Sequence, residues 1–369
     1  MSQSDSIAKA MRAAVDGGVF PGAVLLVRLR GRVVYHEAFG NASLMPSPEP
    51  ARLDTIYDLA SLTKPLATTT AILCLVRDGK VSLDDPAQRH IEELKGSAIG
   101  GATVYHLLTH SSGLPAWRPL YERIKEEASR TEGFLDNKVA WQLALALIKQ
   151  EPVEAPPGAQ SVYSDLGFIV LGVLVERAGG SPLADYCRSA VFEPMRALLG
   201  FRGPKGAASA GLSLIAPTED DPWRGRLLRG EVHDENACAL GGVAGHAGLF
   251  GTAEGVSVVV GHWLDGYKGR SRLLPADLVK RFTTRQENIP GSSWALGWDT
   301  PSAPSSSGSR FSPASFGHLG YTGTSVWVDP SVELEVVLLS NRVHPTRRNE
   351  SIKQFRPLIH DVIYGELIH

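Results

Sequence analysis

The 369-residue sequence has no excess of charge of either sign and no block of basic residues. Its 37 lysine and arginine residues are balanced by 39 aspartate and glutamate residues. Basic stretches interleaved with aromatic residues, which are typical of nucleic-acid-binding proteins, are not found. Nucleic acid and anionic membrane surfaces are therefore unexpected as partners.

Cysteine is scarce, and long apolar stretches are lacking. The three cysteines are odd in number and widely spaced, which suits a reducing compartment better than a disulfide framework. Residues 1–27 carry no basic segment followed by an uninterrupted apolar one, and no run of about 18 apolar residues occurs. We therefore expect a cytoplasmic protein without a membrane partner, provided that no leader has been removed.

The composition is otherwise that of a globular protein with a large core, because 43% of the residues are hydrophobic and 21% are charged. The length suits one large domain or two closely joined ones. Near the start, Ile7, Met11, Ala14 and Val15 fall on one face of a predicted amphipathic helix.

Strand patterns occur at both ends of the chain and helix patterns lie between them. Residues 22–43 predict two strands joined at Arg30-Gly31, whereas the chain from Ser61 to about Trp263 is mostly helical in pattern. Three further strand-like segments follow from about Ser293, namely WALGWDT, FGHLGYTGTSVWVDP and LEVVLLSNRV, and a helix closes the chain.

This order predicts an α/β fold of the α+β kind. The N- and C-terminal segments form an antiparallel sheet flanked by the terminal helices, and a mostly helical region is inserted between them. We expect the sheet region to comprise residues 1–60 and 265–369 and the helical region residues 61–264. The active site is expected at their junction.

The segment YDLASLTKPLATTTAILCLV places a serine and a lysine three residues apart at the head of an apolar helix. Ser61 and Lys64 then share one face of that helix. Pro65 supports a helix start here, because proline is tolerated in the first turn, where its missing N–H has no partner. A serine at this tip is a candidate nucleophile, and Lys64 can serve as its base if burial lowers its pKa.

Two later segments turn this pair into a three-motif set. The sequence SLTK is followed by Tyr163-Ser164-Asp165 and then by His318-Leu319-Gly320. This set resembles that of the serine β-lactamases and penicillin-binding proteins, and its tyrosine is similar to that of the class C type with its family VIII esterase and D,D-peptidase relatives. GKVSLDDP, HLLTHSSGLP, PPGAQSVYSDLGF and GGVAGHAGLFGTAE extend the resemblance over residues 20–364.

The resemblance implies a β-lactamase/transpeptidase-like fold and an acyl-enzyme hydrolase that needs no cofactor and no metal. Ser61 would attack a carbonyl group, and Lys64 with Tyr163 would manage its proton and later activate water. The backbone N–H groups of Ser61 and Tyr321 would form the oxyanion hole. Asp165, His318 and Gly320 would then line the substrate.

The second and third motifs depart from the family pattern. Asp165 stands where an asparagine is usual, and a carboxylate cannot donate a hydrogen bond unless it is protonated. A role as helix N-cap is at least as well supported for Asp165. His318 and Leu319 replace the usual lysine and threonine. Ester hydrolysis is therefore favoured over β-lactam hydrolysis. A protonated His318 with an ordinary pKa would bind anionic substrates more weakly as the pH rises from about 5.5 to 7.5.

Further basic residues follow the last predicted strand. In class C relatives this region can contact a substrate carboxylate, which makes Arg347 and Arg348 candidate binding residues. Asn349 occupies the usual basic position. The alternative is that at least one of these arginines is a solvated charge at a helix start.

Other candidates carry less weight. The histidines and acidic residues between His233 and His262 do not match a zinc-ligand spacing. The glycines of GGVAGHAGLFG more plausibly let this loop pass close to the groove or to the Ser61 helix than bind phosphate. His110 is interpreted as a structural histidine in a turn. Trp117 and Trp223 can line the acyl or leaving-group side.

The sequence thus predicts a serine hydrolase that cleaves an ester or a small amide through a Ser61 acyl-enzyme. A cytoplasmic location would argue against a secreted lactamase or a cell-wall transpeptidase. The alternatives are a muropeptide amidase, a D-amino-acid-type peptidase and a catalytically silent binding protein on the same fold. The oligomeric state does not follow from the sequence.

Overall fold

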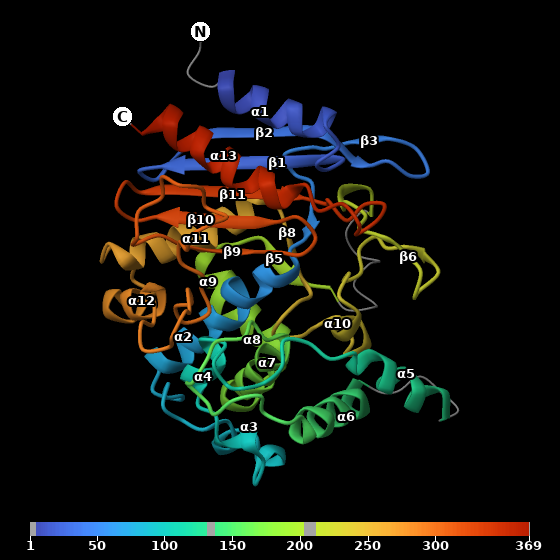
Figure 1. Ribbon diagram of the computed structural model, residues 1–369, viewed down its shortest axis with the longest axis vertical. Coiled ribbons are helices and arrows are strands. Elements are labelled where there is room, and N and C mark those ends of the chain that lie inside the picture. The colour runs from blue at the N-terminus through green and yellow to red at the C-terminus, as the bar shows by residue number, and fades with distance from the viewer. Residues whose placement is uncertain (1–4, 131–136, 203–211, 369) are drawn as a thin grey trace.

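Strands from the two ends of the chain meet in one antiparallel sheet (Figure 1). The computed structural model describes residues 5–130, 137–202 and 212–368. The sheet has six strands in the order β3-β2-β1-β11-β10-β9. Their bounds are Gly22–Leu29 (β1), Arg32–Ser43 (β2), Glu49–Pro50 (β3), Phe316–Leu319 (β9), Ser325–Asp329 (β10) and Leu334–Ser340 (β11).

The central pair of the sheet joins the two ends of the chain. β1 pairs with β11 from Ala23 opposite Ser340 to Leu29 opposite Leu334. The β1–β2 hairpin turns at Arg30 and Gly31, whose φ angles of 49° and 75° belong to the turn that fits the twist of adjacent strands. The predicted fold class and the predicted hairpin are both confirmed.

The terminal helices α1 (Asp5–Asp16) and α13 (Ile352–Leu367) pack side by side on one face of the sheet (Figure 1). Ile7 and Met11 of α1 are fully buried in a cluster with Trp327 of β10 and Ile359 of α13. The amphipathic pattern at the start of the chain therefore identified the sheet-facing side of α1.

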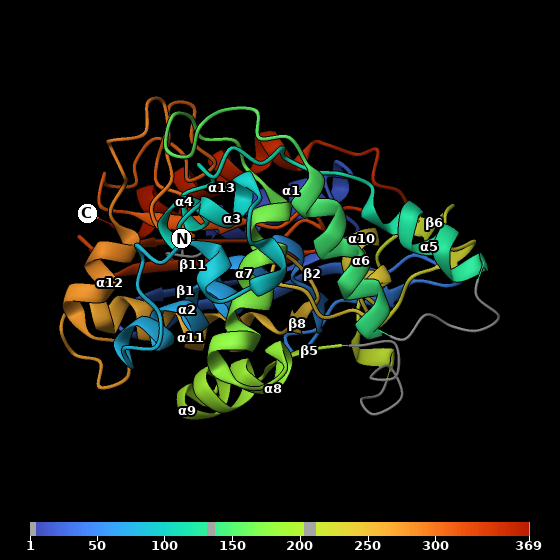
Figure 2. The same cartoon turned by 90° about the horizontal axis from the view of Figure 1, so that it is seen from below.

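The opposite face of the sheet is covered by α11 (Ala253–Tyr267), which packs on β1 and β11 and joins the sheet to the helical region. In that region α7 (Asp165–Gly179) is surrounded by α2 (Thr70–Arg77), α4 (Val104–Leu108) and α8 (Leu183–Cys187) (Figure 2). Every residue from Leu166 to Val175 is buried, because α7 is apolar on all sides.

The remaining α-helices of the described residues are α3 (Ala98–Gly101), α5 (Leu120–Arg130), α6 (Asn137–Gln150), α9 (Glu193–Met195), α10 (Glu235–Ala239) and α12 (Ala276–Thr283). Two small sheets complete the described structure, β4 (Tyr57–Asp58) with β8 (Leu249–Gly251) and β5 (Leu199–Phe201), and β6 (Asp220–Asp221) with β7 (Arg226–Leu227). Among the described residues no single helix is long and apolar enough to cross a membrane. Two consecutive helical segments, Asp165–Gly179 and Leu183–Met195, reach that length and apolar composition only when taken together, and the chain bends by 72° between them.

One predicted strand is wrong. WALGWDT forms a tight turn in which Ala295 N donates to Trp298 O at 2.8 Å, and isolated bridges join Trp294 to Asp299 and Asp299 to Gly317 in place of a strand. Gly297 causes the turn, with φ at 76°, and a Cβ there would lie 2.0 Å from Thr69 Oγ1. The alternating apolar residues of this segment line a turn that packs against the helix after Ser61.

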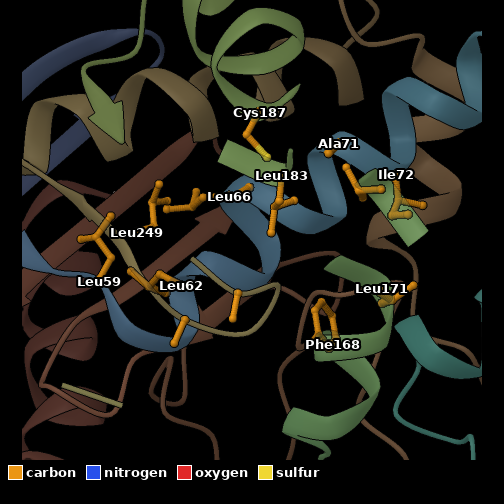
Figure 3. Packing of buried hydrophobic residues seen from close by; sticks show 14 of the residues in the cluster. Leu59, Leu62, Leu66, Ala71, Ile72, Phe168, Leu171, Leu183, Cys187 and Leu249 are labelled. Atoms are coloured by element: carbon orange, nitrogen blue, oxygen red, sulfur yellow. The ribbon is translucent and has the colours of Figure 1, made fainter. Parts of the chain in front are cut away.

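The helix after Ser61 is held by apolar contacts on several sides. Figure 3 shows Leu62 and Leu66 from this segment with Leu249 of β8 and Leu183 of α8, while Phe168 of α7 lies below. These side chains are buried in the larger core cluster of the molecule. The predicted domain limits, 1–60 with 265–369 and 61–264, stay a prediction.

Candidate active site

The segment carrying Ser61 passes through three helix types in a short stretch. A 3₁₀ turn (Ala60–Leu62) precedes a π-helical turn (Lys64–Thr69), and α2 then continues as a regular helix. Pro65 is the second residue of the π-helical turn, so it marks a helix start as predicted. Ala60 has a φ of 47°, a strained value for a non-glycine residue that is typical of functional sites.

Asp58 holds the strained turn in place. Its buried carboxylate accepts hydrogen bonds from Ala60 N at 2.8 Å and from His233 N at 2.7 Å. Ser61 follows directly and remains partly exposed. The turn therefore presents the Ser61 hydroxyl to solvent while the apolar residues around it are buried.

Lys64 is fully buried and contacts three oxygens. Its Nζ lies 2.7 Å from Asp165 Oδ1, 3.1 Å from Ser61 Oγ and 3.3 Å from the carbonyl oxygen of His246. Burial acts most strongly and lowers the pKa of Lys64, but the charges and hydrogen bonds of Asp165 and Tyr163 together outweigh it, and the pKa is raised. The condition under which Lys64 was expected to serve as a base, a pKa lowered by burial, is therefore not met in the free protein.

Asp165 is the first residue of α7, and Ser164 is the N-cap. Ser164 Oγ accepts from Gly167 N at 3.3 Å and donates to Pro115 O at 2.7 Å. The N-cap interpretation of Asp165 is thus corrected. Its carboxylate is turned toward Lys64 instead, with 18% of the side chain exposed.

Tyr163 lies against Lys64 in a group of aromatic rings. Lys64 Nζ is 4.8 Å from the centre of the Tyr163 ring, and the ring stacks on Trp294 at 5.5 Å. Burial raises the pKa of Tyr163, and the opposing effect of Lys64 is smaller. Tyr163 is therefore a neutral phenol in the free protein.

His110 packs against the Tyr163 ring and accepts a hydrogen bond from the residue that follows it. Its Nδ1 accepts the backbone N–H of Ser164 at 3.0 Å, and its ring lies 4.7 Å from that of Tyr163. Burial lowers the pKa of His110 well below the ordinary value, so the ring is neutral. The histidine is structural, as interpreted, but it also positions the second motif, which its local sequence did not reveal.

His318 on β9 is buried, with 2% of its surface exposed. Burial lowers its pKa to about 3, and the charge of Lys64 adds to this effect. Nδ1 donates to Leu319 O at 2.8 Å, so Nε2 has no proton. The predicted anion binding by a protonated His318, with its change between pH 5.5 and 7.5, is therefore wrong.

Gly320 allows the third motif to approach the nucleophile. A Cβ at this position would lie 2.0 Å from Thr324 Oγ1 and 2.6 Å from Leu59 O. Thr324 Oγ1 also donates to Leu59 O at 3.0 Å, and Thr322 Oγ1 donates to Asp58 O at 2.7 Å. The turn after β9 is thus fastened to the segment that precedes Ser61.

Tyr321 lies within this fastened turn. No acceptor for its backbone N–H is found in the described part of the chain. Its side chain is 51% exposed, and the ring is placed between His233, at 5.8 Å, and the guanidinium of Arg342, at 4.4 Å. An unpaired N–H beside Ser61 agrees with the predicted oxyanion position, which stays a prediction.

The two candidate arginines after β11 differ in position. Arg347 borders the site, but it is paired with Glu219 and, at 2.8 Å, with Glu235. Arg348 is exposed and lines neither cavity beside Ser61, so its assignment to substrate binding is corrected. Asn349 donates to Gly18 O at 2.6 Å and thereby ties this loop to the N-terminal segment.

Two cavities open beside the nucleophile, with volumes of about 330 and 420 Å³, and both are lined by Ser61, Tyr163 and Tyr321. The first, which we call the acidic cavity, is lined by Asp165, Asp234, Glu235 and Trp117 together with Arg347. The second, the basic cavity, is lined by Arg342, Lys353 and Arg356 with Trp294, Asp299, His318 and Glu350, the last of which is paired with Lys353 at 2.8 Å. Trp223 lines neither of them. Ser61 lies where the two cavities meet.

The glycine-rich loop contacts the helix after Ser61 as predicted. Gly245 leaves no room for a side chain, because a Cβ would lie 2.0 Å from Phe168 O, and its own carbonyl accepts from Thr68 Oγ1 at 2.6 Å. His246 pairs with Asp234 at 2.8 Å and offers its carbonyl to Lys64. Within the described residues, no group of three or more His, Cys, Asp or Glu side chains is placed to hold a metal ion.

The site combines a serine at a helix start, a lysine one turn along and a tyrosine at the start of a neighbouring helix. Together with the sheet and the inserted helices, it defines a serine hydrolase of β-lactamase fold. The family model for beta-lactamase matches residues 7–360, and the chain belongs to this family.

Proteins of two enterobacteria are similar over most of the chain. A protein of Escherichia coli O157:H7, provisionally named D-alanyl-D-alanine carboxypeptidase, is 34% identical over 359 residues, which cover 89% of this chain and 80% of that protein. A protein of the same name from Salmonella agona is 32% identical over 368 residues, with 92% and 82% covered.

Solved structures share the fold. EstCE1, a hydrolase with promiscuous acyltransferase activity, superposes with a TM-score of 0.77 at 22% identity over 99% of both chains. The octameric penicillin-binding protein homologue from Pyrococcus abyssi gives a TM-score of 0.72 at 20% identity, covering 99% of this chain and 78% of that chain.

Proposed function

We propose that this protein cleaves an ester or a small amide through a covalent acyl-enzyme on Ser61. The observation that carries the proposal is the 3.1 Å contact between Ser61 Oγ and Lys64 Nζ at the meeting point of two cavities. A nucleophile needs a proton acceptor within this reach and space on both sides for the two halves of a substrate.

The protonation states suggest the path of the serine proton. Lys64 is an ammonium group and Tyr163 a neutral phenol, because of their raised pKa values. Asp165 is the group in contact with Lys64 that can accept a proton. As Ser61 Oγ bonds to the carbonyl carbon, Lys64 takes the serine proton and passes one of its own to Asp165. The carbonyl electrons move to the carbonyl oxygen, which accepts hydrogen bonds from the N–H groups of Ser61 and Tyr321.

The tetrahedral intermediate then collapses. Its bond to the leaving group breaks, and the leaving oxygen or nitrogen takes the stored proton through Lys64 and Tyr163. Water next attacks the acyl-enzyme, giving one proton to the same groups, and Ser61 regains its hydroxyl as the acid is released. The two half-reactions use the same residues in opposite directions.

The charges of the cavities support a second candidate substrate. Lys353 is paired with Glu350, but Arg342 and Arg356 form no ion pair among the described residues and give the basic cavity a positive character that suits a leaving group with a carboxylate. The relatives at 34% and 32% identity are provisionally named D-alanyl-D-alanine carboxypeptidases. Cleavage of a terminal D-amino acid is therefore the second candidate, and a neutral ester remains the first because His318 carries no charge.

Hydrolysis of a short-chain p-nitrophenyl ester by the wild type, Ser61→Ala and Lys64→Ala tests the proposal. Both variants should lose on the order of 10³-fold in activity, as losses of a nucleophile or base commonly do. Intact-protein mass spectrometry should detect an acyl group on the wild type and not on Ser61→Ala. Equal activity of Ser61→Ala would disprove the nucleophile.

The remaining alternatives have their own measurements. Release of D-alanine from a peptide ending in D-alanyl-D-alanine tests the second candidate. A binding protein on this fold would be inert toward esters and peptides, and muropeptides would bind wild type and Ser61→Ala equally. A cytoplasmic location stays a prediction.

A further inference from the structure

Two buried arginines lie behind the turn that follows β9. Arg342 and Arg356 are only 6% and 5% exposed. No carboxylate within the described residues forms an ion pair with either guanidinium. A buried cation without a partner acid is costly, so its remaining interactions call for an explanation.

Both arginines donate to carbonyl groups of one short turn. Arg356 Nη2 lies 3.0 Å from Gly320 O and 2.8 Å from Thr324 O. Arg342 Nε donates to Tyr321 O at 2.9 Å. Two cationic side chains, one on α13 and one on the loop after β11, thus hold three carbonyl oxygens between residues 320 and 324.

One of these contacts concerns a particular peptide group. The carbonyl of Gly320 and the N–H of Tyr321 belong to the same planar peptide unit. A hydrogen bond from a guanidinium to that carbonyl draws electron density toward the oxygen and makes the N–H more positive. The Tyr321 N–H also has no acceptor among the described residues, and Tyr321 lines the same cavity as Ser61.

We propose that Arg356 is a positioning residue that orients the Gly320–Tyr321 peptide and strengthens Tyr321 N–H as an oxyanion donor. The inference rests on the proposed Ser61 chemistry and assigns a role to a residue outside the three motifs. The guanidinium acts through the peptide and does not touch the reacting atoms. A fixed cation behind a donor favours negative charge as it develops in the transition state.

Arg356 also borders the basic cavity, so direct binding of a substrate anion is the competing role. The two roles differ in what they affect. Anion binding would alter KM for charged substrates alone. A polarised oxyanion donor would alter kcat for neutral and charged substrates equally, because every substrate forms the oxyanion.

The experiment compares Arg356→Met and Arg356→Lys with a control, Arg28→Met, that removes a half-buried arginine of β1, which lines neither cavity beside Ser61. Each protein is assayed with a neutral ester, p-nitrophenyl butyrate, and an anionic one, 4-butyryloxybenzoate, whose carboxylate belongs to the leaving group. Inhibition by phenylboronic acid, which forms a tetrahedral anionic adduct with an active-site serine, reports on the oxyanion site without turnover. Circular dichroism monitors folding.

Arg356→Met should lose about 10- to 100-fold in kcat with both esters, below the 10²–10³ typical of removing an oxyanion donor entirely. KM should change less than about threefold, phenylboronic acid should bind correspondingly more weakly, and Arg28→Met should match the wild type within about twofold. Arg356→Lys keeps the charge but has a shorter side chain without the rigid guanidinium geometry, so it should be intermediate.

A second measurement covers a variant that fails to fold. In protein labelled with ¹⁵N-tyrosine, the Tyr321 amide resonance, assigned with Tyr321→Phe, should move upfield in Arg356→Lys as the peptide loses polarisation. Unchanged kcat and boronate affinity in folded Arg356→Met, or a loss confined to KM of the anionic ester, overturns the proposal. Wild-type hydrolysis that does not depend on Ser61 refutes the proposed function, and the role of Arg356 with it.

Discussion

Lys64 Nζ lies closer to Asp165 Oδ1, at 2.7 Å, than to Ser61 Oγ, at 3.1 Å. The ion pair sets the protonation of the site, because a carboxylate in contact keeps the buried lysine charged. Where the family pattern has an amide, this chain therefore has the negative group that can receive a proton.

Replacing Asp165 with asparagine tests that assignment. We expect Asp165→Asn to lose about 10²-fold in kcat/KM at pH 7, within the range of general acid–base contributions. Without the carboxylate, burial lowers the pKa of Lys64, so the residual activity should increase as the pH is raised from 7 to 10. A pH–rate profile of both proteins measures this. Asp185→Asn, an exposed change on α8, is the control, and full activity of Asp165→Asn at pH 7 would contradict the proton path.

Asp299, not His318, should govern the pH dependence of anionic substrates. Burial raises the pKa of Asp299 to about 6, and its carboxyl lines the basic cavity. Above pH 6 its negative charge opposes an anionic ester, so KM should increase up to about fivefold between pH 5 and 7.5, equivalent to about 1 kcal/mol at moderate dielectric.

Two variants distinguish the effect of Asp299 on this pH dependence from that of His318. Asp299→Asn should make KM independent of pH, whereas His318→Gln should leave the dependence in place, because burial keeps His318 neutral throughout this range. A neutral ester should show no change in KM in either variant. Loss of the dependence in His318→Gln alone would restore the original assignment.

Gly320→Ala should disrupt the contact between the third motif and the nucleophile. The new Cβ would lie 2.6 Å from the backbone oxygen of Leu59, so the turn must move. We expect a loss of about 10²-fold or more in kcat and about 1–3 kcal/mol of the free energy of unfolding, as is common for overpacking. Gly200→Ala is the matched control, since its Cβ would meet nothing within 4 Å. Similar activity of the two variants would show that the close approach is unimportant.

Glu335 on β11 should make stability depend on pH. It is 1% exposed, and Arg28 Nη1 is 3.9 Å away. Burial raises its pKa to about 7, and Arg28 opposes this only partly. Between pH 4.5 and 7 the folded protein therefore binds more protons than the unfolded chain, and this group lowers the free energy of unfolding by about 3 kcal/mol as the pH rises.

Urea unfolding of the wild type and Glu335→Gln at pH 5 and pH 8 measures this effect. The variant should lose less stability between the two values, because a glutamine has no proton to release. Equal losses in the two proteins would show that Glu335 has an ordinary pKa in the folded state.

Local sequence determined a large part of this protein. Hydrophobic periods identified α1 and the strands at both ends of the chain, because each period depends on residues close together in the sequence. Pro65 and the spacing of Ser61 and Lys64 predicted their contact for the same reason. The pattern failed at WALGWDT, where Gly297 packs against Thr69 and a turn replaces the expected strand.

Tertiary structure alone decided the chemistry around these residues. Asp165 meets Lys64, and Arg356 meets Gly320, across segments whose distance in the sequence gives no sign of contact. The low pKa of His318 likewise results from burial and from Lys64. A pKa and a hydrogen bond depend on every group that the fold brings within a few ångströms. The sequence motifs therefore identified the candidate side chains, whereas the fold determined their protonation states.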